Sequence, residues 1–126
     1  MLNPQAISSN AAGEDSVVLK MTYDNTPFLF KGDVYGKREN TLAESVGYAD
    51  ILKVGNYGSS SGPAFLSRVK PGVSIIAADN APQYNIPAEE TIQDLKESVS
   101  KVHITCLNGT GKITSNGKTY SASSEK

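Results

Sequence analysis

Apolar and polar positions alternate with a period of two from residue 16 to 23, where Leu19 and Met21 share one side of the chain with their odd-numbered neighbours. This period predicts a β-strand. The polar residues 24–26 predict a short turn, and the apolar run at 27–31 predicts a returning strand. The two segments are therefore expected to form a β-hairpin.

Helix-like and strand-like patterns alternate through the middle of the chain. Leu42 and Val46 are four residues apart with charges on the other faces, as in an amphipathic helix, and Gly47 suits the helix end. The patterns predict helices over residues 36–47, 59–71 and 88–99, and strands over 49–54, 72–78 and 101–107. Helices between apolar strands indicate an α/β fold in which a mixed β-sheet is connected by crossover helices.

The two ends of the chain differ in pattern from the middle. Two Asn-Gly pairs flank the segment 111–115 and predict a terminal β-hairpin over 108–121. Residues 1–15 are polar and aperiodic and are expected to form a flexible lead-in, and residues 122–126 a frayed tail. A single domain is therefore expected over 16–121.

Length and charge narrow the classes of function. The chain has 126 residues and a net charge of −1, which suits one domain and argues against a strongly basic nucleic-acid-binding face. The sequence shows no signal peptide and no apolar run long enough to span a bilayer, so it leaves the localisation open. The single cysteine, Cys106, excludes an internal disulfide and is expected to be a small buried apolar side chain.

Common catalytic arrangements are missing from the sequence. The one histidine, His103, lies in a predicted strand, where a structural role is expected. One histidine and one cysteine cannot supply an ordinary four-ligand zinc site. The glycine-rich segment 55–62 lacks the Lys-Ser/Thr ending of a phosphate-binding P-loop.

Asp33 is the most informative candidate for chemistry. It follows an apolar strand and a glycine, where a carboxylate can extend beyond the sheet edge. The same position also suits an aspartate that stabilises a turn or caps a helix. From position alone both interpretations stay open.

Several segments together resemble a known family. "SVVLKMTYDNTPFLFKGDV", "ADILKVGNYGSSS", "FLSRVKPGVSIIAADNAPQYNIPAEETIQDLKES" and "NGTGKITSNGKTYS" resemble the C-terminal half of the metallo-β-lactamase-like domain of ComEC-type DNA-uptake competence proteins and related stand-alone hydrolases. The resemblance runs from about residue 16 to 120. It implies one half of an αββα sandwich, with one mixed sheet and its helices.

The metal ligands of that family are largely replaced here. The family's "TGD" aspartate corresponds to Asp33, in "KGD". Asn56 and Tyr57 stand where the family has two histidines, and Asn85 and Ile86 stand where it has a Gly-His pair. The family's N-terminal "HxHxDH" motif is absent. The resemblance therefore implies a fold whose metal site is degenerate, with Asp33 as a vestigial ligand, and no cofactor is expected.

The resemblance implies a non-catalytic domain of a competence-type protein, structural or binding a ligand weakly, and its parent protein could be membrane-attached. DNA is a weak candidate partner. One alternative is part of a metal-dependent phosphodiesterase or nuclease, with zinc or manganese held only if an N-terminal half supplies ligands. The second is a protein-interaction module whose apolar sheet face pairs with that half or with a second copy. The candidate rim residues are Asn56, Tyr57, Ser59, Ser60 and Asn85.

Overall fold

The computed structural model describes residues 16–58, 61–80, 83, 86–98 and 100–124. Seven strands and four α-helices are found in this part of the chain, with a short 3-10 turn, η1 (Asn56–Gly58). The strands are β1 (Leu19–Tyr23), β2 (Thr26–Phe30), β3 (Ile51–Lys53), β4 (Val73–Ile76), β5 (Lys101–Ile104), β6 (Gly111–Ser115) and β7 (Tyr120–Ser124). The helices are α1 (Gly36–Val46), α2 (Pro63–Val69), α3 (Glu89–Glu97) and α4 (Thr105–Asn108).

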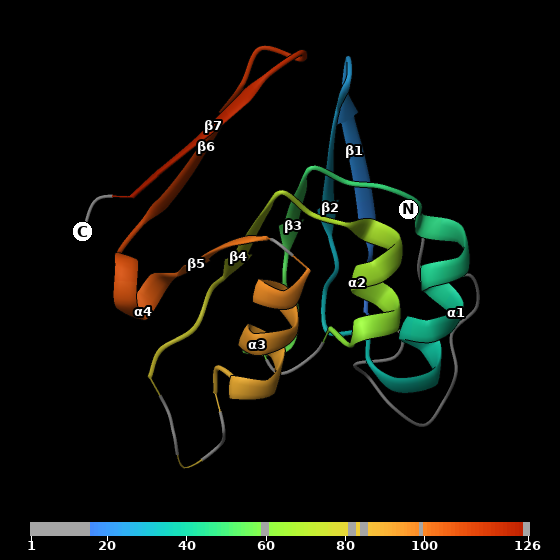
Figure 1. Cartoon of the computed structure of the whole chain (residues 1–126), viewed down its shortest axis with the longest axis vertical. Helices are drawn as coiled ribbons and strands as arrows, with labels where there is room; N and C mark the ends of the chain where they lie inside the picture. The colour runs from blue at the N-terminus through green and yellow to red at the C-terminus, as the bar shows by residue number, and fades with distance from the viewer. Residues whose placement is uncertain (1–15, 59–60, 81–82, 84–85, 99, 125–126) are drawn as a thin grey trace.

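The main sheet has five strands in the order β1-β2-β3-β4-β5. β1 and β2 are antiparallel, whereas the pairs β2–β3, β3–β4 and β4–β5 are parallel. Each parallel crossover is right-handed by a nearly universal rule, and each one here steps in the same direction. The three crossover helices therefore lie together on one side of the sheet (Figure 1). The predicted α/β class with a mixed sheet and crossover helices is confirmed.

The main core fills the space between the sheet and these helices. Leu29 and Leu52 are register partners on neighbouring strands, and both are buried against the helices. Phe65 and Leu66 from α2 and Leu95 from α3 are fully or almost fully buried in the same cluster. We call this side of the sheet the helix face.

The β6–β7 hairpin packs on the opposite side, the open face. The backbone N–H of Asn25 donates to the carbonyl oxygen of Gly117 at 2.7 Å, and the hydroxyl of Ser115 donates to that of Thr26 at 3.1 Å. On this side of the sheet Ile51 and Val73 are buried. The hairpin thus covers part of the open face.

The rest of the open face, over β1 and the end of β2, is exposed. Five large apolar side chains there are each 43–54% exposed. We call this group the open patch: Val17, Leu19, Met21, Tyr23 and Phe30. Among the described residues, this part of the open face is therefore apolar and about half exposed.

Two segments differ from the sequence prediction. The strand expected over 101–107 ends at Ile104, because α4 begins at Thr105. There the hydroxyl of Thr105 exchanges hydrogen bonds with the backbone of Ala78, and the side chain of Asn108 accepts from the N–H of Ile104. These side-chain bonds replace the strand ladder.

At the other end of the hairpin, β7 pairs with β6 through Ser124, so Ser121, Ala122, Ser123 and Ser124 form part of a strand where a frayed tail was expected from residue 122. The predicted lead-in, 1–15, and the last two residues lie outside the described residues. Within the described part of the chain, no helix is long and apolar enough to cross a membrane.

Candidate functional site at the carboxyl edge of the sheet

The parallel strands β2, β3 and β4 end at one edge, and Asp33 lies just beyond the end of β2. Asp33 is exposed, and its backbone N–H donates to the hydroxyl of Ser16 at 2.9 Å. This bond holds the turn against the segment that leads into β1. The pKa of Lys53, at the end of β3, is lowered by burial, while the negative charge of Asp33 partly opposes that shift.

The loop after β3 passes very close to this turn. A Cβ atom at Gly55 would overlap the carbonyl oxygen of Gly32, so position 55 requires glycine. Two residues later, Tyr57 has positive φ and ψ angles (53° and 32°), a conformation that is costly for a large side chain. Its side chain is exposed, at the surface of the edge.

The loop is also anchored on its other side. A Cβ atom at Gly58 would come within 2.7 Å of the side chain of Ile76 and 2.9 Å of that of Pro87. The backbone N–H of Ala88 donates to the carbonyl oxygen of Gly58 at 3.0 Å. The ends of β2, β3 and β4 are thus connected through closely packed backbone.

The structure describes some of the predicted site residues and not others. Asp33 and Tyr57 are brought to this edge, and the backbone of Asn56 lies there within η1. The side chain of Asn56 lies outside what the structure describes, as do Ser59, Ser60 and Asn85. His103 lies in β5, and its ring Nε2 is 3.1 Å from the carbonyl oxygen of Gly109. This contact within the fold is consistent with a structural role.

Sequence reasoning missed a buried ion pair next to this edge. Lys31 is fully buried, and its amine is 2.6 Å from the carboxylate of Glu39. The same amine donates to the carbonyl oxygen of Val34 at 2.6 Å and lies 5.5 Å from the ring centre of Phe65. Burial lowers the pKa of Lys31 from its ordinary 10.5, and the attraction of Glu39 opposes this shift.

The other carboxylate oxygen of Glu39 accepts from the N–H of Gly62 at 2.7 Å. Gly62 is the residue before α2, and it provides no side-chain cap for this helix. The backbone N–H at the start of α2 is therefore hydrogen-bonded by Glu39, a side chain of α1. A signal was available, because Lys31 and Leu29 have the same strand parity, which assigns Lys31 to the helix face.

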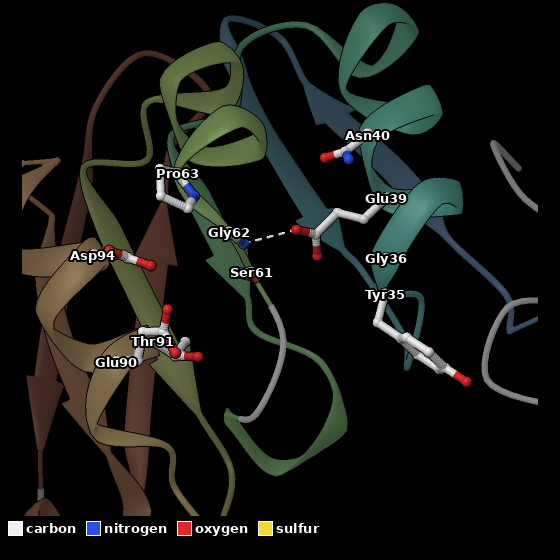
Figure 2. A pocket seen from close by; sticks show the side chains of 10 residues that line it. All are labelled: Tyr35, Gly36, Glu39, Asn40, Ser61, Gly62, Pro63, Glu90, Thr91 and Asp94. Carbon is white, nitrogen blue, oxygen red and sulfur yellow. Dashed lines mark hydrogen bonds between the residues drawn. The ribbon is translucent and has the colours of Figure 1, made fainter.

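A hollow of about 320 Å³ lies beside this pair, between α1, the start of α2 and α3 (Figure 2). Glu39 reaches into it from α1, and Glu90, Thr91 and Asp94 line it from α3. The hydroxyl of Ser61, a residue that is 4% exposed, lines it too and has no hydrogen-bond partner among the described residues.

The hollow is acidic and rich in hydrogen-bonding groups. Burial, and then the negative charges of Glu90 and Glu97, raise the pKa of Asp94. Across the described residues, no three His, Cys, Asp or Glu side chains are grouped so that they could hold a metal ion. Asp33 at the edge is therefore not part of such a group among the described residues.

Comparisons with known proteins identify one distant relative. The chain is 28% identical over 115 residues to Recombination protein 2 of Haemophilus influenzae. The match covers 90% of this chain but 15% of that protein, so the chain spans about one seventh of its relative. No protein-family model matches the chain.

Proposed function

We propose that this chain is a non-catalytic, metallo-β-lactamase-like domain of a DNA-uptake or recombination protein, and that its role is structural. The distant homology to Recombination protein 2 supports the broad class, and the mixed α/β sheet is compatible with half of a metallo-β-lactamase sandwich. The finer assignment rests on the motif resemblance around Asp33 and residues 53–59.

One observation carries the non-catalytic role: the chain has one histidine, His103, and it lies in β5 with its ring Nε2 3.1 Å from the carbonyl oxygen of Gly109. Two-metal hydrolysis requires several histidines and carboxylates to hold the ions and generate hydroxide. The chain has Asn56 and Tyr57 where the resembling family has histidines, and the only histidine of the chain is used in β5. The charged pair beside the edge, Lys31 and Glu39, joins α1 to the start of α2.

Metal analysis tests this proposal. The purified chain is incubated with excess Zn²⁺ or Mn²⁺, dialysed, and measured by elemental mass spectrometry. We expect far less than one ion per chain, unchanged by Asp33→Asn. Asp24→Asn is the matched control, because Asp24 is also exposed but lies in the turn at the other end of β2. One equivalent of metal that is lost in Asp33→Asn and kept in Asp24→Asn would contradict a non-catalytic role.

The exposed position of Asp33 favours a second candidate function. A carboxylate at the carboxyl ends of parallel strands is well placed to complete a metal centre whose other ligands come from a separate segment. In that case the chain is part of a metal-dependent phosphodiesterase or nuclease. Co-expression with the preceding segment of its parent protein, followed by a nuclease assay with Mn²⁺, would show activity that Asp33→Asn abolishes and Asp24→Asn retains.

DNA contact at the loop edge is a further part of the proposal. Backbone amides and hydroxyls around residues 56–61 are the kind of groups that bind phosphate oxygens. Because the net charge of the chain is −1, we expect weak binding to single- or double-stranded DNA that disappears as salt rises from about 50 to 200 mM. Salt-independent binding would contradict phosphate contact.

The open patch suggests how the chain would fill a structural role, namely by contact with another polypeptide. Contiguous exposed apolar surface on a soluble protein marks a site that another surface covers. Four side chains of the open patch lie on β1 and β2, Val17 lies just before β1, and all five are about half exposed. We therefore propose that this face is an interface with another polypeptide, either the preceding half of the same domain or a second copy.

A further inference from the structure

We infer that β1 pairs with β1 of a second copy of this chain, antiparallel and about a two-fold axis at Met21, so that two sheets join edge to edge. This inference rests on the proposed interface at the open patch and names its partner. It is carried by the free strand edge, the position of its one charge, and the register in which the patches meet.

The outer edge of β1 offers backbone groups for pairing. Among the strands that the structure describes, β1 has one neighbour, β2, and therefore forms an edge of the sheet. Proteins normally protect such an edge with charged side chains, proline or a bulge. The only charged residue of β1 is Lys20, and its amine turns to the helix face to donate to the carbonyl oxygen of Val46 at 2.8 Å. The edge therefore lacks a charge on the open face.

Symmetry limits the possible registers. A two-fold axis perpendicular to the sheet keeps both open patches on the same face, and such an axis must pass through a residue position. An axis at Lys20 would place two lysines opposite each other, which is unfavourable. An axis at Thr22 would place Leu19 opposite Asn25, a polar turn residue.

An axis at Met21, the middle residue of β1, pairs all five residues of the strand with one another and avoids the lysine pair, and it moves the contact with Asn25 outside the strand, to Val17. It pairs the two Met21 side chains, places each Leu19 opposite Tyr23 of the second copy, and places Lys20 opposite Thr22. Direct apolar and aromatic cross-strand pairs stabilise antiparallel sheets, and a lysine beside a threonine has no like charge to repel it. This register joins the two open patches into one apolar surface across the two-fold axis, with Phe30 next to it on each side.

Cysteine cross-linking tests the register directly. In a Cys106→Ser background, Met21→Cys is compared with Val17→Cys. The two parent side chains are equally exposed, at 51% and 52%. Directly opposite residues in an antiparallel pair have Cα atoms about 4.5–5.5 Å apart, which suits a disulfide. We expect Met21→Cys to form a covalent dimer under mild oxidation, while the two Val17→Cys thiols, each four residues from the axis, stay unlinked.

Sedimentation over a concentration series tests the association itself. We expect the unmodified chain to dimerise reversibly and Met21→Lys, which places two lysines at the axis, to raise the dimer Kd by about ten-fold or more. The matched control is Leu107→Lys, because Leu107 is 61% exposed but lies in α4. It should leave the Kd within about two-fold of the unmodified value. Circular dichroism confirms that each variant folds.

The outcomes separate this inference from the proposed interface. A chain that stays monomeric to high concentration, or a dimer that Met21→Lys leaves intact, overturns self-pairing. If that monomer binds an apolar dye and Met21→Lys removes the binding, the open patch remains available to another polypeptide, as proposed. If the chain neither dimerises nor binds the dye, both the inference and the proposed interface are wrong.

Discussion

The two faces of the five-stranded sheet differ in how deeply they bury two consecutive residues, Phe30 and Lys31. Phe30, an aromatic residue, is 43% exposed on the open face, whereas Lys31, the next residue, is fully buried on the helix face. Residue type alone predicts the reverse. The difference follows from topology, because three crossovers that step in the same direction bring all their helices to one side.

On the helix face, where helices cover the sheet, even a charged side chain is buried. A buried lysine is tolerated there because Glu39, the carbonyl of Val34 and the ring of Phe65 surround its amine. On the open face, the turn of the β6–β7 hairpin reaches β1 only at Tyr23 among the described contacts, and the apolar side chains of the open patch stay about half exposed. The comparison shows that the helix face is covered by α-helices, whereas the apolar side chains over β1 and the end of β2 are about half exposed.

The largest expected effect comes from breaking the buried ion pair. Lys31→Met leaves the carboxylate of Glu39 without its cation and should lower the free energy of unfolding by about 3–5 kcal/mol, measured by urea denaturation. The matched control is Lys53→Met. Lys53 is half-buried on the open face beside Phe30, and its amine bonds the carbonyl of Val54. We expect the control to cost about 1 kcal/mol or less. Equal losses at the two lysines would remove the distinction between the faces.

Leucine truncations measure the apolar part of the same comparison. Leu52→Ala, at a fully buried position on the helix face, should cost about 3 kcal/mol because it leaves a cavity. Leu19→Ala removes the same atoms from a side chain that is 45% exposed on β1 and should cost about 0.5 kcal/mol for the monomer. Unfolding at low protein concentration avoids any contribution from association. A large loss at Leu19 would mean that the open face is covered within the monomer.

The smallest expected effect on stability comes from Tyr48 and Asp50, which lie just before β3. A hydrogen bond to Asp50 raises the pKa of Tyr48 from 10.0 to about 12. Between these values the folded chain keeps a proton that the unfolded chain has lost, so stability falls as pH rises. The contribution of Tyr48 is fully present below pH 10 and is lost by about pH 12.

Tyr48→Phe should therefore flatten part of the alkaline decline in thermal unfolding temperature over this window. Asp50→Asn is the companion variant, because it removes the carboxylate that accepts the hydrogen bond from Tyr48, and it should flatten the same part of the decline. Lys31 acts in the opposite direction, since its lowered pKa makes stability rise with pH. Only the difference between each variant and the unmodified chain is therefore informative.

Much of the fold could be predicted from local patterns. The alternation around Leu19 and Met21 predicted β1, the Asn-Gly pairs predicted the β6–β7 hairpin, and Gly47 was expected and found at the end of α1. The alternation could not show which side of β1 is covered, because both Val18 and Leu19 are apolar. Val18 is fully buried and Leu19 is exposed, an outcome that depends on where distant helices pack.

The candidate site was less predictable for a related reason. Asp33 and Tyr57 lie at one edge because the parallel strands before them end there together. The contact between Lys31 and Glu39 joins a strand to a helix, and neither residue is unusual in its own segment. The end of β5 at Ile104 was missed because hydrogen bonds to Ala78, far earlier in the chain, favour α4 there.

The five strands lie in the sheet in the same order as in the sequence, and this order affects how the chain can fold while it is synthesised. Each of β2, β3, β4 and β5 adds to the edge formed by the strand before it, and no strand has to insert between two others. A chain that leaves the ribosome in sequence can therefore extend the sheet one strand at a time, and each crossover helix covers its new strand as it arrives. Among the described strands, those that follow β1 all add on the side of β2, so the outer edge of β1 is not extended by any of them.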